Sequence, residues 1–167
     1  MTRSVLVTGS SDSRGSLGFT VASVLAQPPH DFTTIILSGR SLKAVEGCRD
    51  NLQTKLDKDK KNVQVAALRL DVSDANSIHQ AFQWLRDRSG PLRGEPLDVL
   101  INNAGLGSPP NRSKGKNQQG GGASGMFLET EETTIQDVLS VMTVNVAGVS
   151  ELTSESFCFF FFFFFFF

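Results

Sequence analysis

The sequence has no tyrosine, one tryptophan and only two cysteines in 167 residues, and its formal net charge is -1. A charge so near balance provides no broad basic surface for nucleic acid or an anionic membrane. Cys48 and Cys158 lack both disulfide and metal-ligand spacing, which fits a reducing compartment, and we expect no metal site. Met1 leads within four residues into a short apolar segment, so we expect no signal peptide and a cytoplasmic protein.

Aromatic residues are scarce until the end of the chain, where ten of the 14 phenylalanines lie in residues 157–167. Such a homopolymer specifies neither register nor shape, so we expect a domain at 1–156 and a low-complexity tail that is not native structure. As a helix the tail would reach about 16 Å, too short for a membrane anchor. Our hypothesis is that translation has run into a thymine-rich non-coding tract, and a spliced transcript that keeps these codons would contradict it.

Strand-like and helix-like segments alternate along residues 4–155. Apolar runs predict strands at 5–7, 33–38, 63–70 and 97–101, and helical periodicity predicts helices at 19–27, 42–56, 78–85 and 135–149. Residues 106–125 are rich in Gly, Ser, Asn and Lys, which indicates a flexible loop inserted within one domain. The alternation predicts an α/β fold with a parallel sheet covered by helices on both faces.

The first strand runs into a glycine-punctuated turn, Thr8-Gly9 followed by Gly15 and Gly18, and then into a helix. This layout lets the backbone approach a pyrophosphate at the helix N-terminus. A glycine-rich turn is also a common way for a chain to change direction, so the motifs that accompany it must decide between the two readings.

Three further motifs accompany the turn, and together they resemble the N-terminal part of the short-chain dehydrogenase/reductase family. They are Asp71-Val72 after the third strand, Asn102-Asn103-Ala104-Gly105 after the fourth, and Asn145 within the fourth helix. The resemblance covers residues 4 to about 155 and implies a Rossmann-type doubly wound sheet of order 3-2-1-4. It also implies that the fourth strand is an exposed edge and that the fourth helix is partly uncovered.

The resemblance implies a dinucleotide held at the strand ends by Thr8, Gly9, Ser11, Arg14, Gly15, Leu17, Gly18, Arg40, Asp71, Val72, Asn103, Ala104 and Gly105. Asp71 would accept a hydrogen bond from the adenine amino group, or else it only starts the third helix. Asn145 would hold a water of the family's proton relay, or else it is a buried amide that satisfies backbone groups. Gly15 and Gly18 follow Gly9 by six and nine residues, so about three residues are inserted relative to the family turn.

The phosphate preference follows from Ser38-Gly39-Arg40, which places no acid after the second strand. A carboxylate there would bind the adenosine ribose and reject a 2'-phosphate, whereas an arginine attracts that phosphate. Arg14 adds a second cation, so NADP is favoured over NAD. The alternative to a phosphate-binding role for each arginine is that of an ordinary surface residue.

The family's hydride transfer to or from a small carbonyl or alcohol uses a Ser, a Tyr and a Lys that lie beyond the fourth helix. This sequence has no tyrosine at all, so we expect a truncated, inactive form of an NADP-dependent oxidoreductase. The alternatives are a non-catalytic nucleotide-binding or regulatory module and an unstable mis-spliced product without function. We expect a homo-oligomer only for the full-length oxidoreductase from which this truncated form would derive.

Overall fold

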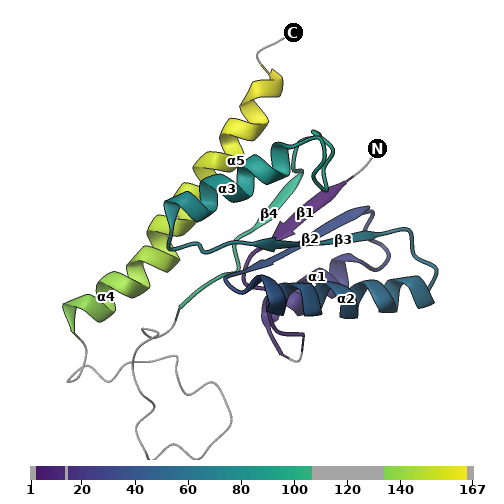
Figure 1. The fold of residues 1–167 in the computed structure, drawn as a ribbon, viewed down its shortest axis with the longest axis horizontal. Helices are drawn as coiled ribbons and strands as arrows, with labels where there is room; N and C mark the ends of the chain where they lie inside the picture. Colours follow the sequence, from purple (N-terminus) through teal and green to yellow (C-terminus); the bar gives the residue numbers. More distant parts are fainter. Residues whose placement is uncertain (1–2, 14, 107–133, 165–167) are drawn as a thin grey trace, which may run out of the picture.

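The computed structural model describes residues 3–13, 15–106 and 134–164, and it describes side chains as far as Ser156. Four parallel strands form one sheet in the order β3-β2-β1-β4, as expected (Figure 1). Their bounds are β1 Ser4–Val7, β2 Thr34–Gly39, β3 Gln64–Arg69 and β4 Val99–Ile101. The parallel pairing and the order reproduce the Rossmann-type arrangement that the sequence indicates.

The helices are α1 Leu17–Leu25, α2 Leu42–Lys58, α3 Ala75–Arg86, α4 Ile135–Met142, a π-helix η2 Thr143–Ala147, and α5 Gly148–Phe164. Side-chain oxygens cap the first turns of the four helices α1 to α4, and the capping residues are Ser16, Ser41, Asp74 and Thr134. α1 ends two residues before the expected Gln27, because the amide of Gln27 already bonds to the carbonyl of Val24 in a tightened last turn.

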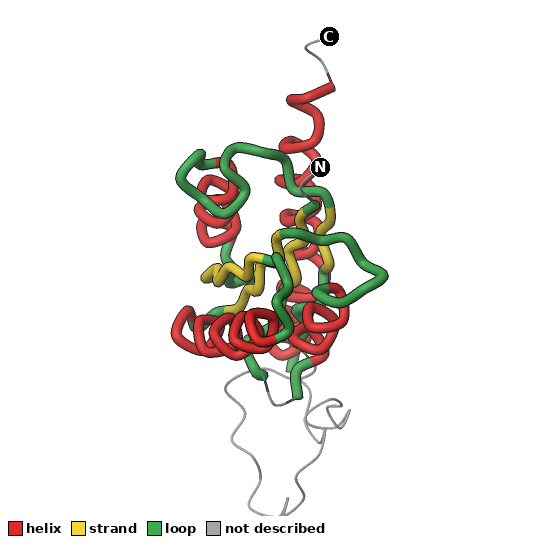
Figure 2. Tube along the Cα trace, turned by 90° about the vertical axis from the view of Figure 1, so that its right-hand side faces the viewer, coloured by secondary structure: helices red, strands yellow, loops and turns green. Residues whose placement is uncertain are grey.

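Helices cover both faces of the sheet, which gives three layers (Figures 1 and 2). Val5 and Val7 point toward α1 and α2 and pack with Phe19 of α1 and Leu52 of α2. Leu6 points the other way, into a second cluster with α3. All four residues of β1 are buried, because a strand inside a parallel sheet is covered on both sides.

β4 has only three residues, yet it is held firmly at its start by Asp98. One carboxylate oxygen of Asp98 accepts from the Ser4 amide at 2.7 Å and from the Ser4 hydroxyl at 2.9 Å. The amide of Asp98 donates back to Ser4 Oγ at 3.1 Å. This reciprocal set fixes the register of β4 against β1, whose pairs begin at Val5 and Val99.

We expect Asp98→Ala to lower the free energy of unfolding by about 1–3 kcal/mol, because it leaves the buried Ser4 amide without its charged acceptor. Glu95→Ala is the matched control, since Glu95 is an exposed acid on the same loop and should change stability by less than about 0.5 kcal/mol. Urea unfolding monitored by circular dichroism measures both values. Equal losses in the two variants would contradict the role given to Asp98.

The single helix expected at 135–149 is instead interrupted by η2 and continues as α5 to Phe164. α5 packs along α3: Leu152 is buried in the second core cluster, and Glu155 accepts from Arg86 at 3.1 Å. Apolar residues of α4 and η2 are exposed in the described structure, among them Ile135 at 81%. This agrees with the expectation of a partly uncovered helix, and β4 pairs with β1 alone among the described strands.

Two sequence-based expectations fall wholly or mostly outside the described residues. Arg14 is one, and the loop at 106–125 is the other, with only its first residue, Leu106, described. Among the described helices, none has the combined length and apolar character needed to cross a bilayer. The division at residue 156 between domain and tail stays a prediction.

Candidate functional site

The turn after β1 is shaped by a close approach between two strand ends. Gly9 has a φ of +69°, and a Cβ built on it would lie 2.8 Å from the Cα of Ala104. Both the left-handed backbone and the missing side chain are therefore needed there. A Cβ on Gly18 would meet the Asn103 side chain at 2.6 Å and the Gly9 carbonyl oxygen at 2.7 Å. The first helix thus begins directly against the residues that follow β4.

Thr8 and Asn103 tie these two segments together. Thr8 Oγ1 accepts from the backbone amides of Asn103 at 2.9 Å and Ala104 at 2.8 Å. In return the Asn103 side-chain amide donates to the carbonyl of Thr8 at 2.8 Å and to that of Gly9 at 3.2 Å. Because the hydrogen bonds run in both directions, the glycine turn and the Asn-Ala-Gly segment are held as one structure.

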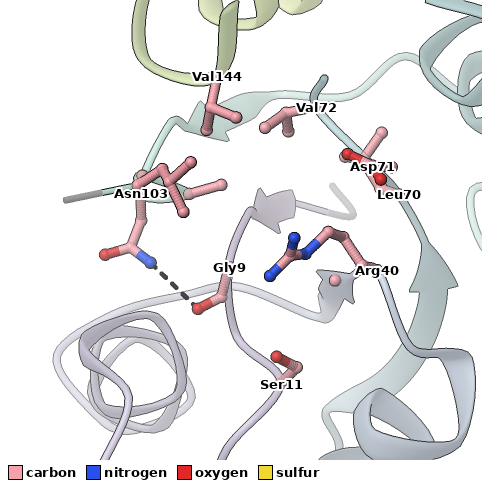
Figure 3. A pocket seen from close by; sticks show the side chains of 12 residues that line it. Gly9, Ser11, Arg40, Leu70, Asp71, Val72, Asn103 and Val144 are labelled. Atoms are coloured by element: carbon pink, nitrogen blue, oxygen red, sulfur yellow. Dashed lines mark hydrogen bonds between the residues drawn. The ribbon is translucent and has the colours of Figure 1, made fainter. Parts of the chain in front are cut away.

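A cavity of about 250 Å³ opens at this edge of the sheet, where the carboxyl ends of all four strands converge (Figure 3). β1 has β2 as its neighbour on one side and β4 on the other, so the strand order reverses direction at β1. Open α/β sheets bind ligands at such a switch point. The lining residues of the cavity are Gly9, Ser11, Gly39, Arg40, Leu70, Asp71, Val72, Asn103, Ala104, Gly105, Leu106 and Val144.

Glycine also makes room on the β2 side of the cavity. A Cβ on Gly39 would lie 2.9 Å from the Cβ of Ser11, so a larger residue would push the turn away from the end of β2. Arg40 follows immediately, and its guanidinium group points into the cavity toward Gly9 (Figure 3). The cavity therefore carries a cation between the glycine turn and the end of β3.

Asp71 supplies a negative charge to the cavity from the end of β3. Partial burial acts to raise the pKa of its carboxyl group, but hydrogen bonds from the Ser73 hydroxyl and amide, helped by Arg40 and Arg69, outweigh burial and lower the pKa below its usual value. The carboxylate stays ionised down to mildly acidic pH, and the stability it contributes is lost only as the pH falls through that lowered pKa. Asp71 thus offers an ionised acceptor at neutral pH.

η2 brings Asn145 to Leu106, a residue that lines the cavity. The Asn145 side chain accepts from the Leu106 amide at 2.8 Å and donates to the Leu106 carbonyl at 2.9 Å. The amide therefore satisfies backbone groups, as one of the two sequence-based interpretations expects, although the residue is exposed rather than buried. Its relay role stays a prediction.

The structure brings together most of the residues expected at a cofactor site. Eight of them line the cavity: Gly9, Ser11, Arg40, Asp71, Val72, Asn103, Ala104 and Gly105. Thr8 lies buried beneath it, and Gly18 packs on Asn103. Gly15 and Leu17 are exposed and do not line it, and nothing lies within 4 Å of a Cβ built on Gly15.

Four lining residues escaped the sequence reasoning: Gly39, Leu70, Leu106 and Val144. Each adjoins a residue that was identified: Gly39, Leu70 and Leu106 extend strand-end motifs by one position, and Val144 precedes Asn145 in the fourth helix. No group of three or more His, Cys, Asp or Glu side chains in the described parts of the chain is arranged to hold a metal ion.

The sequence is similar to a known protein family and to several known proteins. A family model described as short chain dehydrogenase matches residues 3–160. An NADP-dependent 3-hydroxy acid dehydrogenase of Schizosaccharomyces pombe is 29% identical over 152 residues, which cover 90% of this chain and 46% of that protein. The short-chain dehydrogenase/reductase family 9C member 7 of Bos taurus is 32% identical over 119 residues, 70% of this chain and 31% of that protein. The chain spans less than half the length of these relatives.

Solved structures share the fold. The alcohol dehydrogenase of the archaeon Thermococcus sibiricus, complexed with 5-hydroxy-NADP, has a TM-score of 0.67 at 23% identity, covering 95% of this chain and 53% of that one. An NADPH-bound carbonyl reductase from chicken fatty liver has a TM-score of 0.64 at 24% identity, covering 95% of this chain and 48% of that one. At these identities the likeness establishes the fold.

Proposed function

The chain belongs to the short-chain dehydrogenase family, and from this premise we propose that it binds NADP in the cavity at the carboxyl ends of its strands. The single observation that carries the proposal is Arg40 pointing into that cavity from the end of β2, where the sequence has no acid. A guanidinium at this place attracts a 2'-phosphate, whereas a carboxylate would repel it.

The described residues fit the rest of the adenosine half of the cofactor. Gly9 and Gly39 pack closely on Ala104 and Ser11 and line the cavity without a side chain, which suits close approach of phosphate and ribose. Asp71 presents an ionised acceptor for the adenine amino group, and Val72 provides an apolar wall beside it. α1 begins at Leu17 beside the turn, so its N-terminal dipole favours the pyrophosphate.

The bound cofactor supplies hydride chemistry, and this chain's own residues bind and orient it. We propose that the gene product is related to an oxidoreductase of small carbonyl or alcohol substrates, as the names of its relatives suggest. The 167 residues contain no tyrosine, so the second candidate function is a nucleotide-binding module without catalysis. Both candidates share the cofactor cavity, and they differ in whether the downstream genomic frames encode a Ser followed by a Tyr-xxx-Lys motif.

The test is equilibrium titration of the full chain with NADP and NAD. We expect wild type to prefer NADP and Arg40→Ala to weaken NADP by about 10–100-fold, the loss typical of one charge-assisted contact, while NAD affinity changes less than about twofold. Arg49→Ala is the charge-matched control, because Arg49 lies on α2 away from the cavity and pairs with Asp50.

Two results would count against the proposal. A folded wild-type chain that binds neither nucleotide would remove the cofactor site altogether. If Arg40→Ala weakened NADP and NAD equally, Arg40 would not read the 2'-phosphate. A chain that fails to fold, judged by circular dichroism, would support the unstable product as the third interpretation.

A further inference from the structure

The start of α5 packs directly against the loop after β3. A Cβ built on Gly148 would overlap the carbonyl oxygen of Val72 and lie 2.9 Å from its carbonyl carbon. Gly148 itself is buried. The obstacle is backbone rather than a movable side chain, so either the helix or the loop must shift to admit even a methyl group.

Space, and not backbone conformation, explains glycine at this position. Gly148 has φ −62° and ψ −39°, which are ordinary helical values that alanine adopts readily. Glycine inside a helix costs about 0.5–1 kcal/mol relative to alanine. Gly47 in α2 gives the contrast, because it is exposed and nothing lies within 4 Å of a Cβ built there.

The loop that Gly148 touches forms the wall assigned to adenine. Val72 and its neighbour Asp71 both line the cavity. On its other side this loop is fixed by α3, since the Asp71 amide donates to the Ser77 hydroxyl at 3.0 Å. The loop is therefore held between α3 and the first residue of α5, and Gly148 is the point of contact on the α5 side.

The same helical segment also reaches the other side of the cavity. Val144, one turn before Gly148, lines the cavity directly and lies near Val72 in Figure 3. Asn145 holds Leu106, which follows β4, through two backbone hydrogen bonds. η2 and the start of α5 therefore meet the loops after both β3 and β4 from one side.

We propose that Gly148 is a positioning residue for base recognition: by letting α5 rest on the Val72 carbonyl, it sets where Asp71 and Val72 stand relative to the adenine of the cofactor. The inference rests on the proposed binding of NADP. A side chain at position 148 displaces the loop, so the Asp71 carboxylate no longer meets the adenine amino group, while the contacts of Arg40 with the 2'-phosphate are kept.

The first test compares NADP with its hypoxanthine analogue, which has a carbonyl oxygen in place of the adenine amino group. We expect wild type to bind NADP about tenfold more tightly than the analogue, because the analogue turns its oxygen toward the Asp71 carboxylate. We expect Gly148→Ala to bind NADP about tenfold more weakly than wild type and to bind the two nucleotides about equally. Gly47→Ala, the matched helical control, should keep both wild-type affinities.

This discrimination ratio separates positioning from stability. A purely structural loss would lower the folded fraction and weaken both nucleotides by the same factor, leaving the ratio unchanged. A folded Gly148→Ala chain that keeps the wild-type ratio would overturn the inference. Equal wild-type affinity for both nucleotides would overturn it too, while leaving NADP binding intact. Absence of any wild-type binding would instead contradict the proposed function itself.

Amide hydrogen exchange on the wild-type chain decides the matter even where Gly148→Ala does not fold. We expect NADP to slow exchange of residues 148–152 by about threefold or more, although none of them lines the cavity, because the bound nucleotide stiffens the loop on which α5 rests. Residues 49–53 in the middle of α2 are the control and should not change. Protection of Asp71 and Val72 without any change at 148–152 would show that the contact does not couple α5 to the site, and the inference would fail.

Discussion

Alanine in place of Gly9 is expected to lower the free energy of unfolding by about 2–5 kcal/mol. Two costs add: a left-handed backbone costs a residue with a Cβ about 1–2 kcal/mol, and overpacking costs about 1–3 kcal/mol more. The clash is with the backbone of Ala104, 2.8 Å from the added carbon, so rotating a side chain cannot relieve it. Displacement of Ala104 should also abolish measurable NADP binding, because both residues line the cavity.

Gly15→Ala is the control for this variant. Gly15 belongs to the same turn, is exposed, and has open space around the position of a Cβ. Its substitution should change stability by less than about 1 kcal/mol, with stabilisation as the favoured sign because alanine restricts the unfolded chain. Urea titration measures both variants. Similar losses of stability at Gly9 and Gly15 would mean that the whole turn rejects side chains, and that the contact with Ala104 is not decisive.

Thr8→Val is expected to cost about 2–4 kcal/mol of unfolding free energy, because it leaves the Ala104 N–H without its acceptor, at about 1–3 kcal/mol, and removes one of two acceptors of the Asn103 N–H, at about 1 kcal/mol. Valine keeps the shape of threonine but cannot accept from the amides of Asn103 and Ala104. Thr8 is only 1% exposed, so water cannot replace the lost hydroxyl at that position. The freed segment after β4 should also weaken NADP binding.

Thr8→Ser tests whether the hydroxyl or the packing matters. Serine keeps the acceptor and loses one methyl group, so we expect a loss of about 1 kcal/mol. Thermal or urea unfolding distinguishes the two variants directly. A serine variant as unstable as the valine variant would assign the effect to the methyl group, and the two amide contacts would then have little energetic weight.

Much of the fold and part of the site could be predicted because they follow from short-range patterns. Apolar runs identified the strands, and the chemistry at their ends identified Arg40 and Asp71, since parallel strands bring their carboxyl ends to one edge. The structure also distinguishes the two later glycines of the turn. Gly18 packs on Asn103, whereas Gly15 is exposed and nothing lies within 4 Å of a Cβ built on it.

The remaining features depend on geometry that no local pattern encodes. Thr8 Oγ1 accepts from amides that lie 95 and 96 positions away in sequence, a pairing that no local pattern predicts, and its contact with the cofactor stays a prediction. The π-helix was missed because apolar spacing over 135–149 fits an unbroken helix equally well. The sequence predicts no function for Gly148, because a glycine within a helix indicates only lower helix stability. Its contact with Val72 becomes visible in the folded structure.

The two-way hydrogen bonding of Thr8 and Asn103 has a consequence for evolution as well as for stability. The side chain of each residue hydrogen-bonds to the backbone of the other. The energetic effects of substitutions at positions 8 and 103 are therefore not additive. A first substitution loosens the segment to which the second side chain bonds, so the second substitution has less left to lose. Drift at either position is therefore contingent on the other, and the pair should change together or remain as it is.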